Sequence, residues 1–524
     1  MGNTYSVPNR YTRLHKAVML LCLSAALLAV TSYVNSSTAS SEVKMESYAD
    51  IIKQMMANPN RYTEPYRDQY HFTPIEGWMN DPNGLVFFGG KWHMFYQHRH
   101  PLAPAMSWGH AISTDLIHWE HVQPAILPDS QGMIFSGSAV VDKNDTSGFF
   151  GGKPGVVAIY TYHGADNYED QAIAYSADGI NFTKYEKNPV IPKLKDIPGQ
   201  PDYKDFRDPK VFWHEPTKRW IMVVAGGLLR FYSSPNLRDW TFESINSNIE
   251  TECPDFYELP IDGSAENKKW VLSGGGRWYM LGKFDGKIFT PESDQIPMNY
   301  GVDCYASQTF SDVPDGRRIM ISWLYWWAYK DWPTQPWSGG GMTIPYELKL
   351  RTLSDGVRLV QEPVKETEAL RGERKYWDNQ TITPASNILD GMHGKTLELI
   401  AEFQPGSASE FGVKMRKGKD EETIVGYRVA DKKLFLDRSH SGLKTNPEIF
   451  DKVSDAPMEL IDGKVKMRIF LDWSSVEVIG NDGAKLITHR ILPSDASDGL
   501  EVYAKGGEAK LVSLNVYEMK SVWR

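Results

Sequence analysis

The sequence predicts a chain built almost entirely of β-strands, with a β-propeller followed by an antiparallel β-sandwich. Two observations lead to this prediction. Between about residues 67 and 360, short apolar or alternating runs are separated by turn residues, and one aromatic turn phrase recurs. Beyond residue 378, longer runs alternate strictly between apolar and polar side chains. At 524 residues the chain is too long for one ordinary domain and suits two.

The N-terminal part contains many short strand-like runs and no long stretch with a helical period. The clearest runs are residues 85–88, 92–96, 156–162, 210–214, 220–225, 270–273 and 319–323. The phrase STDLIHW at 113–119 is echoed by SSPNLRDW at 233–240 and, more weakly, by SADGINF at 176–182. Recurring units of short strands favour a β-propeller. A long β-sandwich or a β-helix is the alternative, but neither predicts the repeated aromatic turn.

The C-terminal part has the pattern of a separate antiparallel sandwich. Its alternating runs are residues 397–403, 411–415, 424–429, 433–437, 465–471, 475–479 and 510–517, and Asn481-Asp482-Gly483 forms a tight hairpin turn. The charged segment 361–378 is expected to be a linker with a short helix, so that the sandwich spans 379–524. The one clear helix elsewhere lies near residues 48–57, within an N-terminal extension at 40–66.

The first 39 residues read as a secretory signal peptide. A basic flank at Arg10, Arg13 and Lys16 precedes an apolar run from 17 to 34 and small residues at 37–39. An uncleaved membrane anchor is the alternative, because the run approaches the ~20 residues that span a bilayer. We therefore expect a secreted protein without stable membrane insertion. Sequons at Asn35, Asn144, Asn181 and Asn379 would make it a glycoprotein in a host that glycosylates, with the last three in surface loops.

Composition excludes some partners. The net charge of −9 argues against nucleic acid, since phosphate binding needs a basic face. After signal cleavage only Cys253 and Cys304 remain, which is too few for a disulfide framework, so packing must stabilise the fold. The 17 Trp serve mainly core packing, while a minority could stack on sugar rings in a cleft.

Three short stretches with carboxylates predict the chemistry. They are WMNDPNG at 78–84, Arg207-Asp208-Pro209 and Glu252-Cys253-Pro254. Each alone could be a turn, a solvated ion pair or a loop edge. Because they fall in three different repeat units, a propeller could bring all three to one central channel.

Glycoside hydrolysis needs two carboxyl groups in different protonation states. Asp81, flanked by asparagine amides, can accept hydrogen bonds and stay ionised. Glu252, beside an apolar cysteine and near other carboxylates, is expected to hold a proton, because desolvation and like charge disfavour its ionised form. The pattern therefore predicts Asp81 as nucleophile and Glu252 as general acid.

The three stretches, in this order, resemble the invertase, inulinase and levanase family, glycoside hydrolase family 32. Supporting matches over residues 67–520 are Tyr96-Gln97, Trp108-Gly109-His110-Ala111, residues 135–138, residues 303–306 and residues 471–478. The resemblance implies a five-bladed propeller at 67–360 followed by the β-sandwich. It implies an enzyme that releases terminal fructose from sucrose, inulin or levan through a covalent fructosyl-enzyme, with retention and with neither metal nor cofactor.

The resemblance also implies roles for individual residues. Asp208 would stabilise the transition state, with Asp81 and Glu252 roughly 5–5.5 Å apart as in other retaining sites. The remaining positions would bind fructose: Asn80, Gln97, Trp108, Phe135, Ser136 and Arg207 in the subsite, with Asp303 and Tyr305 on its rim.

The chain departs from the family pattern at three places, all expected to hold the leaving sugar. These are residues 98–101 (HRHP), residues 323–332 with four tryptophans, and residues 337–347, where two arginines are missing. The fructose side looks intact. A fructosyltransferase and a catalytically silent fructan-binding protein are the alternative functions. The sandwich could be a carbohydrate-binding module, but structural support of the propeller is the safer interpretation, and the oligomeric state stays open.

Overall fold

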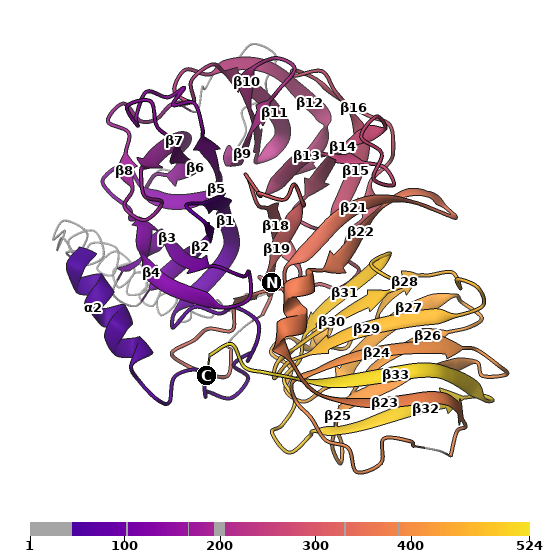
Figure 1. Ribbon diagram of the computed structural model, residues 1–524. Coiled ribbons are helices and arrows are strands. Elements are labelled where there is room, and N and C mark those ends of the chain that lie inside the picture. Colours follow the sequence, from indigo (N-terminus) through magenta and orange to yellow (C-terminus); the bar gives the residue numbers. More distant parts are fainter. Residues whose placement is uncertain are drawn as a thin grey trace, which may run out of the picture. The chain divides into compact units, whose positions relative to one another are not determined.

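The structure is a computed structural model. It describes residues 45–523 apart from 101–102, 166, 193–204, 330–331 and 386 (Figure 1). The predicted signal peptide, Asn35 and Lys330-Asp331 lie outside the described residues. The described residues fall into two units, which divide between Gln54 and Met55. Helix α2 (Met45–Met56) occupies the region where a helix was predicted.

The nearly all-β prediction is confirmed. Within the described residues, the chain from 78 to 363 forms five small antiparallel sheets in sequence order. The first holds β1 (Trp78–Phe88), β2 (Lys91–His100), β3 (Ala103–Ser113) and β4 (Trp119–Ile126), and the second holds β5 (Met133–Asp142), β6 (Gly155–His163), β7 (Glu169–Ser176) and β8 (Thr183–Lys184). The third holds β9 (Arg207–His214), β10 (Arg219–Ala225), β11 (Gly227–Ser234) and β12 (Thr241–Thr251).

The last two of these sheets contain short accessory strands. The fourth sheet holds β13 (Pro254–Pro260), β14 (Lys268–Gly274), β15 (Trp278–Phe284), β16 (Phe289–Pro291) and β17 (Ile296–Pro297). The fifth holds β18 (Tyr305–Thr309), β19 (Ile319–Leu324), β20 (Gly341–Met342), β21 (Tyr346–Leu353) and β22 (Gly356–Pro363). The first strands of the sheets contact one another in the cyclic order β1, β5, β9, β13, β18 and β1 (Figure 1).

The recurring turn phrase joins the third and fourth strands of the first three sheets. In the first copy, the Asp115 carboxylate accepts the backbone N–H groups of residues 117 and 118, at 3.0 and 2.8 Å. Asn236 and Asp178 accept equivalent N–H groups in the other copies. The indole N–H of Trp119 donates to the Leu116 carbonyl, and Trp240 repeats this bond. The phrase recurs because a short acceptor and an aromatic ring together close this turn.

The C-terminal sandwich consists of two antiparallel sheets. The larger holds β23 (Arg371–Ile382), β33 (Ala509–Met519), β24 (Leu397–Gln404), β29 (Val465–Leu471), β30 (Ser475–Gly480) and β31 (Lys485–Arg490). The smaller holds β28 (Ser454–Pro457), β27 (Lys433–His440), β26 (Glu422–Arg428), β25 (Glu410–Lys417) and β32 (Gly499–Lys505), with the short helix α3 (Pro447–Phe450) beside it. Alternating apolar side chains from both sheets form one core, in which the rings of Phe403 and Phe411 lie 5.0 Å apart.

The interval 361–378, expected to be a linker, is ordered differently. It contains the end of β22, a 3₁₀ helix η1 (Lys365–Leu370) and the first residues of β23. Its charged side chains are exposed along an edge strand whose backbone pairs with β33, so high polarity here marks a solvated sheet edge. Asn379 also lies in β23 rather than in a loop, whereas Asn144 and Asn181 are exposed in turns.

Buried ion pairs join the propeller-like part to the sandwich. His71 lies between Asp472 (2.8 Å) and Glu477 (3.0 Å), and Arg490 pairs with Asp68. Burial alone would lower the pKa of His71, but its hydrogen bonds to the two carboxylates outweigh burial and raise the pKa to about 10. Both parts therefore share a polar, charge-compensated interface.

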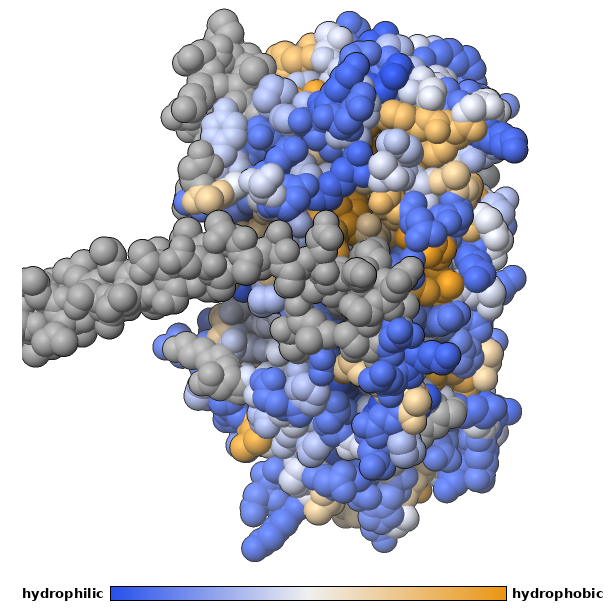
Figure 2. Space-filling view, turned by 90° about the vertical axis from the view of Figure 1, so that its left-hand side faces the viewer, coloured by the Kyte–Doolittle hydropathy of each residue, from blue (hydrophilic) through white to orange (hydrophobic). Residues whose placement is uncertain are grey.

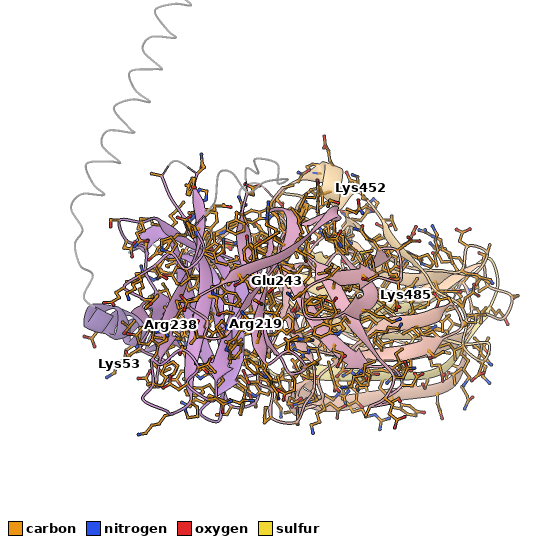
Figure 3. The ribbon with its side chains drawn as sticks, turned by 90° about the horizontal axis from the view of Figure 1, so that it is seen from above. Lys53, Arg219, Arg238, Glu243, Lys452 and Lys485 are labelled. Carbon is orange, nitrogen blue, oxygen red and sulfur yellow. The ribbon has the colours of Figure 1, made fainter. Side chains whose placement is uncertain are left out.

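The surface is mainly polar. Hydrophilic residues dominate the face in Figure 2, with hydrophobic residues in smaller areas among them. Seen from above, Arg219 and Glu243 mark the third sheet, and Lys485 marks the sandwich, where its ammonium lies 5.6 Å from the ring of Tyr300 (Figure 3). None of the described helices is both long enough and apolar enough to cross a bilayer.

Candidate active site

A cavity of about 390 Å³ opens where the inner strands of several sheets begin. It takes residues from the beginnings of β1, β5, β9 and β18, from the end of β2, and from the segment before β13. Such a volume suits a small ligand. The lining residues are Trp78, Asn80, Asp81, Gln97, Arg99, Met106, Phe135, Ser136, Arg207, Asp208, Glu252, Cys253, Tyr305 and Trp327.

Asp81 lies on β1, within the first of two irregularities in its pairing with β2, between Met79 and Pro82. Gly84, with φ +53°, permits this irregular backbone; a Cβ there would lie 2.6 Å from the Phe95 ring. The Asp81 side chain is 8% exposed and accepts hydrogen bonds from Asn80 Nδ2 (3.2 Å) and Ser136 Oγ (2.7 Å). Two asparagine amides were expected to donate hydrogen bonds to Asp81, but the donors are one asparagine amide and one serine hydroxyl. Asn83 turns away and accepts the Gly137 N–H instead.

Asp208 is the second residue of β9; its backbone is left-handed, with φ +61°, and it is 5% exposed. Its Oδ2 accepts the Cys253 backbone N–H at 2.9 Å, and its own N–H donates to the Thr161 hydroxyl. Burial and the nearby carboxylates of Asp81 and Glu252 raise the pKa of Asp208 to about 8, although Arg207 opposes this. A non-glycine residue held at positive φ beside two other acids is a costly arrangement that is typical of functional sites.

Glu252 is the most accessible of the three acids, with a side chain that is 43% exposed. The Tyr305 hydroxyl donates to its Oε2 at 2.9 Å, and Arg207 Nη1 lies 3.3 Å from its Oε1. The expected apolar surroundings are therefore not present, because Cys253 points its thiol toward Asp81 and Asp208 instead. Glu252 is held at the cavity mouth by two hydrogen-bond donors.

The Cys253 thiol lies between the two buried aspartates. Its Sγ is 3.4 Å from Oδ2 of Asp81 and 3.4 Å from Oδ2 of Asp208. These three ligand atoms lie within 4.8 Å of one another, a spacing that a metal ion could use. Burial and the three surrounding carboxylates raise the pKa of the thiol well above its usual value, which disfavours the thiolate that a metal would need. The donor set suits a protonated thiol that separates two acids.

Most of the sequence-predicted site residues lie in this cavity. Besides the three acids, the predicted residues that line it are Asn80, Gln97, Phe135, Ser136, Arg207 and Tyr305. Gln97 keeps its amide nitrogen without a hydrogen-bond partner among the described residues, although it is buried beside the cavity. The Phe135 ring stacks on His163, with centroids 4.2 Å apart.

Two predicted residues lie elsewhere. Trp108 does not line the cavity; it is fully buried in the core behind it and donates its indole N–H to the Phe135 carbonyl at 3.0 Å. Asp303 was expected on the rim but is completely buried against the sandwich. There it pairs with Arg438 at 2.9 Å and accepts the Tyr329 hydroxyl at 2.6 Å. Asp303 lies in a bend before β18, so it does not share the strand geometry that places Tyr305 at the cavity.

The cavity mouth contains residues without a predicted role: Trp78, Arg99, Met106 and Trp327. Trp327 is 52% exposed, and its ring lies 5.7 Å from that of Trp78. Arg99 and Trp327 belong to segments in which the chain departs from the family pattern. This departure was the sequence feature that could have identified them as cavity residues. The third such segment, 337–347, does not line the cavity, because Trp337 is buried in the core and Tyr346 bonds to Glu477.

Comparisons with known proteins agree with this geometry. The models "Glycosyl hydrolases family 32 N-terminal domain" and "Glycosyl hydrolases family 32 C terminal" match residues 71–363 and 366–518. A levanase of Bacillus subtilis (strain 168) is 48% identical over 499 residues, which cover 89% of this chain and 72% of the levanase. An extracellular exo-inulinase of Aspergillus awamori is 36% identical over 523 residues, covering 88% of this chain and 96% of the exo-inulinase.

Solved structures give the same result. The crystal structure of exo-inulinase from Aspergillus awamori superposes with a TM-score of 0.80 at 34% identity, covering 88% of this chain and 100% of that one. The β-fructofuranosidase from Schwanniomyces occidentalis complexed with fructosyl-erythritol has a TM-score of 0.78 at 29% identity, covering 88% and 99%. The fold, the cavity and the matches over both parts show that the chain belongs to glycosyl hydrolase family 32.

Proposed function

We propose that this protein is a retaining β-fructosidase that hydrolyses terminal β-D-fructofuranosyl residues from sucrose and from fructans. One observation carries the proposal: Asp81, Asp208 and Glu252, from three separate sheets or their connections, line one sugar-sized cavity. Two of these acids are buried and the third is accessible, which is the kind of asymmetry that glycoside hydrolysis requires.

The first step forms a covalent fructosyl-enzyme. A carboxylate oxygen of Asp81 attacks the anomeric carbon of fructose while the bond to the leaving-group oxygen breaks, and Glu252 gives its proton to that oxygen. Ser136 and Asn80 hold the Asp81 carboxylate by hydrogen bonds, so its orientation is fixed before substrate arrives. The exposure of Glu252 at the mouth suits a group that meets the leaving sugar.

The second step releases fructose. Glu252, now ionised, takes a proton from water, the water oxygen attacks the anomeric carbon, and the ester bond to Asp81 breaks. Two displacements restore the original configuration. Tyr305 and Arg207 contact the two oxygens of Glu252 and hold its side chain in place between the steps.

The remaining residues bind fructose and stabilise the transition state. Asp208, at the bottom of the cavity, would accept hydrogen bonds from fructose hydroxyl groups as positive charge develops on the ring. Gln97 would use its unpartnered amide donor on another hydroxyl. The Phe135 ring supplies an apolar face in the same subsite.

The names of two relatives, a levanase and an extracellular exo-inulinase, support a fructan substrate. We therefore propose levan, inulin and sucrose as candidate substrates and secretion as the destination of the chain, with residues 1–39 as the signal peptide. We also propose a five-bladed propeller for 67–360, supported by the cyclic contacts of the inner strands, and a supporting sandwich for 379–524.

The test is incubation of the full chain with sucrose, inulin and levan side by side, with products separated by size. Free fructose is expected from the start of each productive reaction, and the Asp81→Asn variant should give none. Oligosaccharides that accumulate at high sucrose would instead indicate a fructosyltransferase. Tight fructan binding without any product would indicate a silent binding protein and overturn the proposal.

A further inference from the structure

A second cavity, of about 400 Å³, lies at the other ends of the same inner strands. It is formed by the end of β5 and the turn after it, the end of β9, the start of β10, and the segment between β18 and β19. On β5, Ser136 lines the first cavity and Asp142 lines the second. They are six positions apart along the strand, which corresponds to roughly 20 Å.

Buried polar contacts close the space between the two cavities. The Lys210 ammonium lies 3.0 Å from the Asp255 carboxylate and donates to the Thr309 carbonyl at 2.8 Å, and Asp255 also accepts the Thr309 N–H. Lys210 and Asp255 are both almost fully buried. A ligand in the second cavity therefore cannot be an extension of one in the first.

The walls of the second cavity combine aromatic rings with polar groups. Phe212, Trp213 and Trp220 supply the rings, and the two indoles lie 5.2 Å apart at 69°. The Trp213 N–H donates to Glu215 (2.7 Å) and the Trp220 N–H donates to Thr146 (2.9 Å), so hydrogen bonds fix both indoles. A rigid aromatic wall of this kind binds an apolar ring face at low entropic cost.

Arg318 provides free hydrogen-bond donors beside these rings. Only its Nη1 is used, in long contacts to the Thr309 hydroxyl (3.5 Å) and the Phe310 carbonyl (3.4 Å). Its Nε and Nη2 donate to none of the described residues, although the guanidinium packs over the Tyr257 ring and lines the cavity. The site thus has unused donors from a side chain that the fold already orients.

The charges select the kind of ligand. The charged residues that line the cavity are Asp142, Lys143, Glu215, Asp312 and Arg318, and their carboxylates already have partners. Asp312 pairs with Lys143 at 2.9 Å and Glu215 pairs with Lys218, while the fully buried Asp142 accepts the Thr146 and Ser147 N–H groups. Because these carboxylates and cations largely compensate one another, the cavity suits a neutral ligand better than an ion, which would need a free counter-charge. Sugar hydroxyls both donate and accept, so they can bond to Arg318 and to the remaining lone pairs of Glu215 or Asp312 at the same time.

We propose that this second cavity is a binding site for a neutral oligosaccharide and that it holds a stretch of fructan away from the catalytic cavity. The choice of fructan rests on the proposed function. The volume lies in the range of small-molecule sites, and the mixture of aromatic wall and convergent polar groups is typical of them. A second contact would keep the enzyme on its polymer between cleavage events and raise its effective affinity.

The test uses the full chain with Asp81→Asn, which prevents cleavage, produced in a host without N-glycosylation because the sequon at Asn144 lies at the cavity. Calorimetric titration with a short inulin-type oligosaccharide should give two sites per chain. Adding Trp213→Ala should weaken the second site about tenfold. Trp240→Ala is the matched control, since Trp240 is equally part-buried against the same core and should leave both sites intact.

Kinetics provide the second readout. In the otherwise unaltered enzyme, Trp213→Ala should raise KM for polymeric inulin several-fold and leave kcat/KM for sucrose unchanged. If Trp213→Ala does not fold, Arg318→Gln decides in the same assays. A single binding site that survives Trp213→Ala and Arg318→Gln overturns the inference. Two binding sites that both survive these substitutions overturn it as well. A single site abolished by Trp213→Ala supports the inference while refuting fructan binding at the catalytic cavity, so the two failures are distinguishable.

Discussion

Replacement of Asp303 should destabilise the protein without altering its chemistry. Its family position suggested a role on the rim of the sugar site, but the side chain is fully buried at the junction with the sandwich. Oδ2 accepts the Arg490 backbone N–H (2.8 Å) and the Tyr329 hydroxyl (2.6 Å) and pairs with Arg438 (2.9 Å). We expect Asp303→Ala to lower stability strongly while sucrose turnover in the folded enzyme stays normal.

The magnitude follows from what the substitution leaves behind. Arg438 is itself fully buried, and without Asp303 its charge has no carboxylate partner in this cluster. Removing one partner of a buried ion pair costs about 3–5 kcal/mol. Asp303→Asn keeps the shape and an acceptor but loses the charge, so it should cost less, about 1.5–3 kcal/mol. Either loss is a large part of the roughly 5–15 kcal/mol by which folded proteins are stable.

The assay is urea unfolding monitored by tryptophan fluorescence. Midpoints are compared between variants whose unfolding free energy falls with the same slope against urea concentration. Burial alone would raise the pKa of Asp303, but Arg438 and His489 outweigh burial and lower it. A carboxyl with a lowered pKa stabilises the fold above its unfolded pKa of about 3.9 and loses this contribution as pH falls further. The difference between wild type and Asp303→Asn should therefore be complete at pH 7 and shrink below about pH 4.

A surface pair serves as control. Glu459 pairs with Lys432, and both side chains are about 60% exposed, at 63% and 60%. Glu459→Ala should change stability by less than about 1 kcal/mol. An Asp303→Ala variant with an unchanged urea midpoint but a raised KM for sucrose would refute the structural role and return the residue to the rim of the site.

Four further predictions concern the acids and the interface. Asp81→Asn should abolish sucrose turnover, because an amide is not a nucleophile; activity near wild type would remove it from that role. Glu252→Gln should spare a substrate with a good leaving group more than sucrose, and equal losses in kcat would count against an acid. Burial and its acidic neighbours raise the pKa of Asp208 to about 8, so its ionisation costs stability progressively between about pH 4 and 8. Asp208→Asn should thus raise the thermal midpoint at pH 9 and change it little at pH 4, whereas a uniform shift would contradict this. With its pKa raised to about 10, His71 stabilises the fold fully below pH 6.5 and loses this contribution as the pH rises to 10. His71→Gln should therefore flatten the decline of the thermal midpoint between about pH 6.5 and 10. Parallel pH profiles of wild type and variant would argue against the charged histidine.

Local pattern determined most of the secondary structure. Period-two alternation located strands such as β24 and β29, because one face of each sandwich sheet is buried and the other is solvated. The aromatic turn phrase marked the link between the third and fourth strands, since its acceptor and its ring act within a few residues. The same logic failed for 371–378, where an exposed edge strand has the composition of a linker.

The sequence also identified the three acids, because Asp81, Asp208 and Glu252 each stand in a short motif with a recognisable neighbourhood. Tertiary structure decided how each is surrounded. The Cys253 thiol turns toward the two aspartates, and Glu252 stays exposed beside Tyr305. These contacts join residues far apart in the chain, and no local spacing encodes them.

Asp303 and Trp108 show most clearly which side-chain positions could not be predicted from the sequence. Both stand in motifs that resemble the fructose-binding pattern, yet one is buried against Arg438 of the sandwich and the other in the core behind the cavity. The sequence by itself predicted most of the strands and proposed three acids as the reacting groups. Only the tertiary structure decided which polar side chains face the cavity and which are buried, because burial of a charge depends on a partner that folding brings from a distant segment.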